Sequence, residues 1–144
     1  MKKIVVLFLV LSLSSCNSQE KKATTFEDVT VEQFQNMIGK NGAQLIDVRT
    51  PGEYENGHIK DALLIDYMST DFKDKAFKGL DKSKPVLVYC ASGGRSAKSA
   101  KMYKDAGFEK VYNLLGGFRA WSAKNLEIEK YSQKIIKEIS NIHC

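Results

Sequence analysis

The sequence predicts an α/β domain in which a mostly parallel sheet carries helices on both faces. Mainly apolar runs typical of buried strands recur at residues 43–48, 62–65 and 86–89. Segments with the start signals and spacing of helices lie between them. Because a parallel pair of strands needs a long crossover, this alternation of strand and helix favours parallel pairing.

The first predicted helix begins after Thr30. Thr30 and Gln33 have the spacing of a capping box, in which each side chain accepts a hydrogen bond from the backbone N–H of the other residue. Apolar positions at helical spacing follow at Val31, Phe34, Met37 and Ile38, with a stop at Gly39. Thr50 repeats the cap at a second helix, with Pro51 at the first helical position and Glu53 at the third.

The rest of the domain continues the alternation. Ile59 and residues 62–65 indicate a further short strand, and a mostly polar helix is expected over 71–80. The strand at 86–89 leads through a short loop to a helix over 95–106, closed by Gly107. The last predicted elements are a strand at 111–113, a break at Gly116-Gly117 and a short helix at 118–124.

Residues 1–15 have the pattern of an export signal: a basic start, then an apolar stretch of about ten residues, which is too short to span a membrane. Leu13-Ser14-Ser15-Cys16 resembles the bacterial lipobox, which implies that Cys16 is lipidated and becomes the mature N-terminus. An ordinary cleaved signal is the alternative. Asn17, where an aspartate would favour retention at the inner membrane, favours an outer-membrane anchor on the periplasmic side of the cell envelope. Residues 16–25 are polar and predict a flexible tether.

The full chain has 43% apolar and 27% charged residues, which places most of it among soluble globular domains. The formal net charge of +5 falls to about +3 once Lys2 and Lys3 are removed with the signal. This small excess, without a basic stripe that alternates with aromatic residues, argues against nucleic-acid binding. We expect contact with the membrane through the lipid anchor alone, and a monomeric domain.

Cys90 follows directly on the apolar strand at 86–89 and stands just ahead of the helix at 95–106. Backbone N–H groups of a glycine-bearing loop at a helix N-terminus point inward, and the helix dipole adds positive potential. Such a field favours thiolate over thiol, and Arg95 supplies a nearby cation. Ligands of parallel sheets gather at the carboxyl ends of the strands, where this cysteine is placed.

Four separate motifs resemble those of a single-domain rhodanese, or sulfurtransferase, across residues 26–130. They are Asp47-Val48-Arg49 with Glu53-Tyr54, Gly57-His58-Ile59, Cys90 to Ser96, and Leu115-Gly116-Gly117-Phe118 with Trp121. The resemblance implies a three-layer fold with a central sheet of about five short strands. Related phosphatases carry seven residues from cysteine to arginine, whereas six are present here, so the resemblance favours sulfur transfer over phosphatase or arsenate reductase chemistry.

The resemblance implies a thiosulfate sulfurtransferase-like enzyme in which Cys90 is catalytic and carries a persulfide. The sulfur donor would be a small sulfur-containing anion such as thiosulfate. The acceptor would be cyanide, a thiol or a protein thiol. The residues expected to bind the donor are Ala91, Ser92, Gly93, Gly94, Arg95 and Ser96. No metal or organic cofactor is expected. A binding or sulfur-carrier module with little turnover stays open as the alternative.

Three further motif residues are expected to have structural roles near the site: Asp47, Arg49 and His58. Residues 131–144 carry isoleucines at helical spacing and are expected to form a helix that packs on the domain, with a docking segment or a tail as alternatives. Cys144 is the final residue. It either lies unpaired or serves as a resolving thiol for Cys90.

Overall fold

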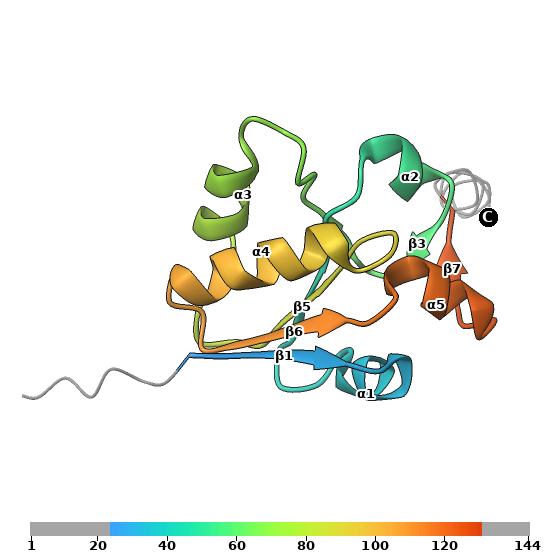
Figure 1. The fold of residues 1–144 in the computed structure, drawn as a ribbon, viewed down its shortest axis with the longest axis horizontal. Coiled ribbons are helices and arrows are strands. Elements are labelled where there is room, and N and C mark those ends of the chain that lie inside the picture. Colours follow the sequence, from blue (N-terminus) through green and yellow to red (C-terminus); the bar gives the residue numbers. More distant parts are fainter. Residues whose placement is uncertain (1–23, 131–144) are drawn as a thin grey trace, which may run out of the picture.

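The computed structural model describes residues 24–130 as one α/β domain, shown in Figure 1. Its five-stranded sheet has the order β1-β6-β5-β2-β4, and every neighbouring pair is parallel. These strands are β1 (Thr25–Val29), β2 (Gln44–Asp47), β4 (Leu63–Leu64), β5 (Val86–Tyr89) and β6 (Lys110–Leu114). The predicted fold class is therefore confirmed.

Helices cover both faces of the sheet, with α3 and α4 above it and α1 below it in Figure 1. The helices are α1 (Val31–Met37), α2 (Pro51–Glu55), α3 (Phe72–Lys78), α4 (Gly94–Asp105) and α5 (Gly117–Ala123). Val86 and Val88 pack with α3 and α4, while Leu87 and Tyr89 pack with α1 and α5 on the opposite face. A strand buried on both faces has no polar face, which is why 86–89 reads as a continuous apolar run.

The capping boxes form as predicted. Thr30 and Gln33 exchange both capping hydrogen bonds at α1, and Thr50 and Glu53 do so at α2, with Pro51 in the first turn. Because these signals lie within four consecutive residues, local sequence is sufficient to place the two helix starts.

Two strands were not predicted. β1 begins at Thr25, one residue before the expected start of the domain, and it is an edge strand whose Glu27 and Asp28 are exposed. β7 (Ile128–Glu129) pairs antiparallel with β3 (His58–Ile59) in a separate two-stranded sheet. The expected single strand across residues 59–65 is in fact two, because Asp61 turns the chain with a positive φ of 62° between β3 and β4.

Several predictions fall outside the described residues: the signal at 1–15, Cys16, most of the tether, residues 131–144 and Cys144. Within residues 24–130, no helix has the length and apolar character needed to cross a membrane.

Candidate active site

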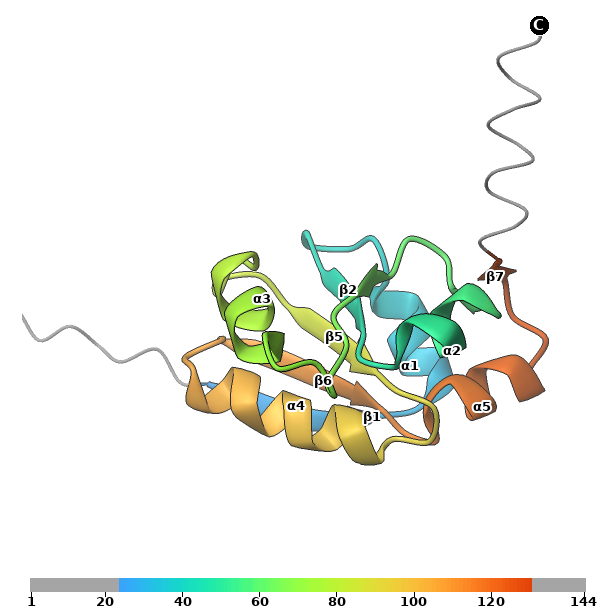
Figure 2. The same ribbon diagram turned by 90° about the horizontal axis from the view of Figure 1, so that it is seen from above.

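Cys90 stands at the carboxyl end of β5, the central strand of the sheet, and α4 begins four residues later at Gly94. In Figure 2 the loop between them lies at the same end of the sheet as α5. Gly93 caps α4 with a φ of 104°, in a region that side-chain-bearing residues rarely adopt. This turn brings the first N–H groups of α4 back towards the cysteine.

The sulfur of Cys90 is buried and surrounded by donors. The Gly93 N–H lies 3.1 Å and the Ser96 hydroxyl 3.4 Å from Sγ, and the residue is 1% exposed. Burial alone would raise the pKa of the thiol, but hydrogen bonds from the Ser96 hydroxyl and from the backbone of Ser96, Ser92 and Gly93 outweigh it. The pKa of Cys90 is therefore lowered, which increases the fraction present as nucleophilic thiolate at neutral pH.

The first turn of α5 donates hydrogen bonds to the loop that carries Cys90. The Phe118 N–H donates to the Cys90 carbonyl oxygen at 2.7 Å, and the Arg119 N–H donates to that of Ala91 at 3.1 Å. Gly117 makes this approach possible, because a Cβ there would lie 2.4 Å from the Cys90 carbonyl oxygen. The sequence predicts a break at Gly116-Gly117 within a family motif, and the structure shows that Gly117 also lets α5 approach the cysteine loop.

Arg95 of α4 forms a bidentate ion pair with Glu53 of α2. Its two terminal nitrogens lie 2.8 and 2.7 Å from the two Glu53 carboxylate oxygens. This pairing lowers the pKa of Glu53 to about 2 and raises that of Arg95. The charge of Cys90 contributes further to the raised pKa of Arg95. Glu53 is thus the side-chain partner of Arg95. The sequence predicts Arg95 as a cation near Cys90 that binds the donor, and Glu53 as a helix cap and a motif residue.

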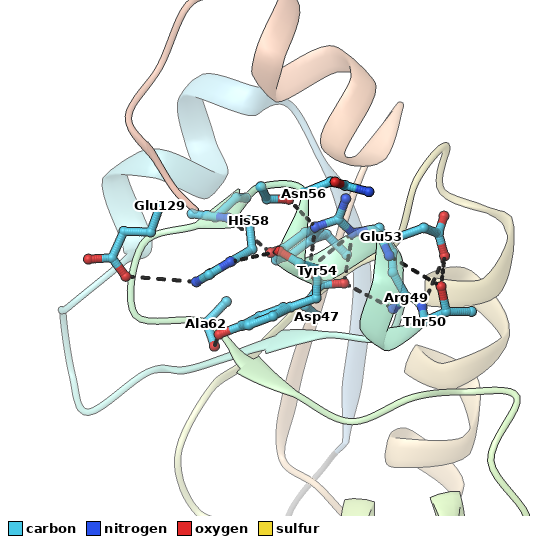
Figure 3. A network of polar contacts seen from close by, with 12 residues as sticks. Asp47, Arg49, Thr50, Glu53, Tyr54, Asn56, His58, Ala62 and Glu129 are labelled. Atoms are coloured by element: carbon cyan, nitrogen blue, oxygen red, sulfur yellow. Dashed lines mark hydrogen bonds and ion pairs between the residues drawn. The ribbon is translucent and has the colours of Figure 1, made fainter. Parts of the chain in front are cut away.

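Asp47 and Arg49 form a buried ion pair at the end of β2, drawn in Figure 3. Arg49 donates from Nε to both Asp47 oxygens at 3.0 Å and from a terminal nitrogen to the Gly57 carbonyl oxygen at 2.7 Å. Burial lowers the pKa of Arg49, but the hydrogen bonds and charge of Asp47 outweigh it and hold the pKa above its usual value. The guanidinium also stacks 4.0 Å from the ring centre of Phe118, whose N–H holds Cys90.

His58 lies in β3 and contacts residues other than the cysteine loop (Figure 3). Its ring stacks on Tyr54 with the centres 3.6 Å apart, Nδ1 lies 3.0 Å from the Tyr54 carbonyl oxygen, and Nε2 lies 3.8 Å from a Glu129 oxygen. The Tyr54 hydroxyl in turn donates to the Ala62 carbonyl oxygen at 2.6 Å. These contacts join α2 to β3 and β7.

The structure thus sorts the predicted site residues into two groups. Gly93 and Ser96 donate to the sulfur of Cys90, as does the backbone of Ser92, which is itself exposed. Arg95 lies beside them, and Gly94 is exposed as the first residue of α4. Asp47, Arg49 and His58 belong to the polar network of Figure 3, which reaches the loop through Phe118. Among residues 24–130, no three His, Cys, Asp or Glu side chains are grouped so that they could hold a metal ion.

Comparison with known proteins gives concordant matches. The family model described as "Rhodanese-like domain" matches residues 30–124. YqhL of Bacillus subtilis (strain 168) is 34% identical over 121 residues, which cover 84% of this chain and 90% of that protein. Thiosulfate sulfurtransferase GlpE of Coxiella burnetii (strain RSA 331 / Henzerling II) is 39% identical over 88 residues, covering 60% of this chain and 78% of GlpE.

Solved structures agree with these matches. The crystal structure of a rhodanese-like domain protein from Staphylococcus aureus superposes with a TM-score of 0.60 at 30% identity, covering 72% of this chain and 99% of that one.

Proposed function

This chain belongs to the rhodanese-like domain family, and from that premise we propose that it is a sulfurtransferase that carries sulfur as a persulfide on Cys90. The observation that carries the proposal is the environment of the sulfur. Sγ is held by the Gly93 N–H and the Ser96 hydroxyl, and these donors lower the pKa of the thiol. The similarity to GlpE supports the same reaction class.

The reaction proceeds in two steps. The Cys90 thiolate attacks the outer sulfur of the donor, a new S–S bond forms, and the donor's own bond to that sulfur breaks. With thiosulfate the leaving group is sulfite, which departs with the bonding electron pair. A second nucleophile, cyanide or a thiolate, then attacks the outer sulfur of the persulfide and releases Cys90 as thiolate. No net oxidation occurs, because the sulfane sulfur moves from one nucleophile to another.

The loop favours the charged states of this cycle. N–H groups aimed at Sγ stabilise a thiolate, and the outer sulfur of a persulfide would carry the same charge one bond further out. The hydrogen bonds that α5 donates to the Cys90 and Ala91 carbonyl oxygens hold these N–H groups in place before the sulfur compound binds. The six-residue spacing from Cys90 to Arg95 suits a single sulfur atom better than a phosphate with its oxygens, which supports sulfur transfer over phosphatase chemistry.

Turnover tests the proposal directly. Purified protein should form thiocyanate from thiosulfate and cyanide, and Cys90→Ser should abolish this activity. Full turnover in Cys90→Ser would contradict the persulfide mechanism. A protein that forms the persulfide but passes it on very slowly would instead be the sulfur-carrier module.

We further propose that Cys16 anchors the protein to the cell envelope by a lipid, on the strength of Leu13-Ser14-Ser15-Cys16 and the apolar stretch before it. Metabolic labelling with a fatty acid should mark the parent protein and leave Cys16→Ala unlabelled. Equal labelling of the two would contradict the anchor.

A further inference from the structure

Helices α1 and α2 both begin with a capping box, but the side chain that accepts from the cap is neutral in α1 (Gln33) and charged in α2 (Glu53). At α1 the Thr30 N–H donates to the Gln33 side chain at 2.9 Å, and at α2 the Thr50 N–H donates to the Glu53 side chain at 2.9 Å. Either residue type satisfies a capping box. The neutral Gln33 therefore shows that capping alone does not require the negative charge of Glu53.

What distinguishes Glu53 is its contact with Arg95. Both carboxylate oxygens of Glu53 accept hydrogen bonds from Arg95, at 2.8 and 2.7 Å, and Gln33 has no such partner among the described residues. With a pKa of about 2, Glu53 is ionised throughout the physiological range. Arg95 lies in the first turn of α4, next to Ser96, whose hydroxyl lies 3.4 Å from the Cys90 sulfur. A negative, a positive and a negative group therefore follow one another from α2 to the sulfur.

We infer that Glu53 is a specificity-determining residue that neutralises Arg95, so that the site prefers sulfane donors with one negative charge, such as alkyl persulfides, over the thiosulfate dianion. This inference rests on the proposed function of Cys90. Glu53 touches Arg95 rather than the reacting atoms, so it acts by positioning the guanidinium and by reducing the net charge at the site.

The charge balance of the first step explains the preference. With an alkyl persulfide, the Cys90 thiolate attacks the terminal sulfur, the donor's S–S bond breaks, and an alkyl thiolate leaves with the electron pair, so two negative charges are brought together. With thiosulfate the same attack brings three together and releases the sulfite dianion. The unfavourable interaction with Glu53 grows with the charge of the donor, so it slows the reaction of the dianion more.

Glu53→Gln tests this directly, since it keeps a side-chain oxygen that can cap α2 while it removes the charge and one of the two acceptors for Arg95. We expect kcat/KM to rise for both donors, and the ratio of thiosulfate to alkyl persulfide to rise on the order of fivefold. Glu55→Gln is the matched control, because it removes the same charge from the exposed end of the same helix and should leave the ratio unchanged. An unchanged ratio in Glu53→Gln would overturn the inference, as would an equal change in both variants.

The salt dependence of kcat/KM provides a second test, and measurements on the unmodified protein alone can contradict the inference. Because Glu53 neutralises Arg95, kcat/KM for thiosulfate should not fall as ionic strength rises. In Glu53→Gln it should fall, since salt then screens the attraction between the dianion and a cation that Glu53 no longer neutralises. A steep fall in the unmodified protein would overturn the inference. Absence of a Cys90 persulfide with either donor would refute the proposed function itself, which is a different result from turnover with an unchanged ratio.

Discussion

Replacing Gly117 with alanine should destabilise the protein by about 3–6 kcal/mol and displace the Cys90 loop. The new Cβ would lie 2.4 Å from the Cys90 carbonyl oxygen and 2.8 Å from the Ser92 nitrogen. Both are backbone atoms, so neither can move aside as the end of a long side chain would. The loop must shift, and the hydrogen bond from Phe118 to Cys90 lengthens or breaks.

The magnitude combines three contributions. Gly117 has a φ of +57°, and the left-handed region costs a non-glycine residue about 1–2 kcal/mol. Overpacking a rigid site costs about 1–3 kcal/mol, and the weakened hydrogen bond about 1 kcal/mol. For a domain of this size, the expected loss corresponds to a fall in Tm of about 10–20 °C.

Urea unfolding of the two proteins measures the change in free energy, and the rate of Cys90 alkylation reports on the loop. Gly52→Ala is the control, because Gly52 has space around its Cα and lies in α2. It should be neutral or stabilise the protein by up to about 1 kcal/mol. A Gly117→Ala protein within 1 kcal/mol of the parent, with unchanged alkylation, would refute the packing argument.

Three further predictions follow from the contacts of the site. Ser96→Ala should raise the pKa of Cys90, since it removes a hydrogen bond to the thiolate, and the pH profile of alkylation should move to higher pH. Asp47→Ala should destabilise the fold by about 3–5 kcal/mol because it leaves Arg49 buried and unpaired, and adding Arg49→Met should restore part of the loss in urea unfolding. In the folded protein the pKa of Glu53 is about 2, against an ordinary 4.5, so its contribution to stability is complete above pH 4.5 and is lost as the pH falls towards 2. Glu53→Gln should therefore reduce the change in the free energy of unfolding across that pH range by about 1–2 kcal/mol, a figure that allows for the partial exposure of Glu53.

For each of these variants, one result would contradict the reasoning. Ser99→Ala removes a buried hydroxyl that donates to the Arg95 carbonyl oxygen, and it should leave the alkylation profile in place. Equal profiles for Ser96→Ala and the parent would contradict the role of that hydroxyl. A double Asp47→Ala, Arg49→Met variant less stable than Asp47→Ala alone would show that the unpaired charge is not what costs stability. For Glu53, identical stability curves for parent and variant between pH 5 and 2 would contradict the coupling to Arg95.

Features encoded within a few consecutive residues could be predicted from the sequence. The capping boxes at Thr30 and Thr50, the apolar strand at 86–89 and the cysteine at the end of that strand are all of this kind. The site's position followed from them, since the carboxyl end of a central parallel strand is where this fold class binds ligands.

Features that depend on contacts between distant residues could not be predicted in this way. Glu53 and Arg95 are 42 residues apart, and their ion pair exists because α2 and α4 start at the same end of the sheet. Gly117 likewise meets Cys90 only in the folded chain. β1 was missed for a different reason: as an exposed edge strand with two acidic residues, it lacks the apolar run that marks the central strands.

The central claim is that Cys90 carries the transferred sulfur, and mass spectrometry of the protein after incubation with a sulfane donor tests it most directly. We predict a gain of one sulfur atom that maps to Cys90, is absent in Cys90→Ser and disappears when cyanide is added, with one thiocyanate formed for each sulfur lost. A protein that turns over donor and acceptor without sulfur on Cys90, or that retains the added sulfur in Cys90→Ser, would contradict the claim.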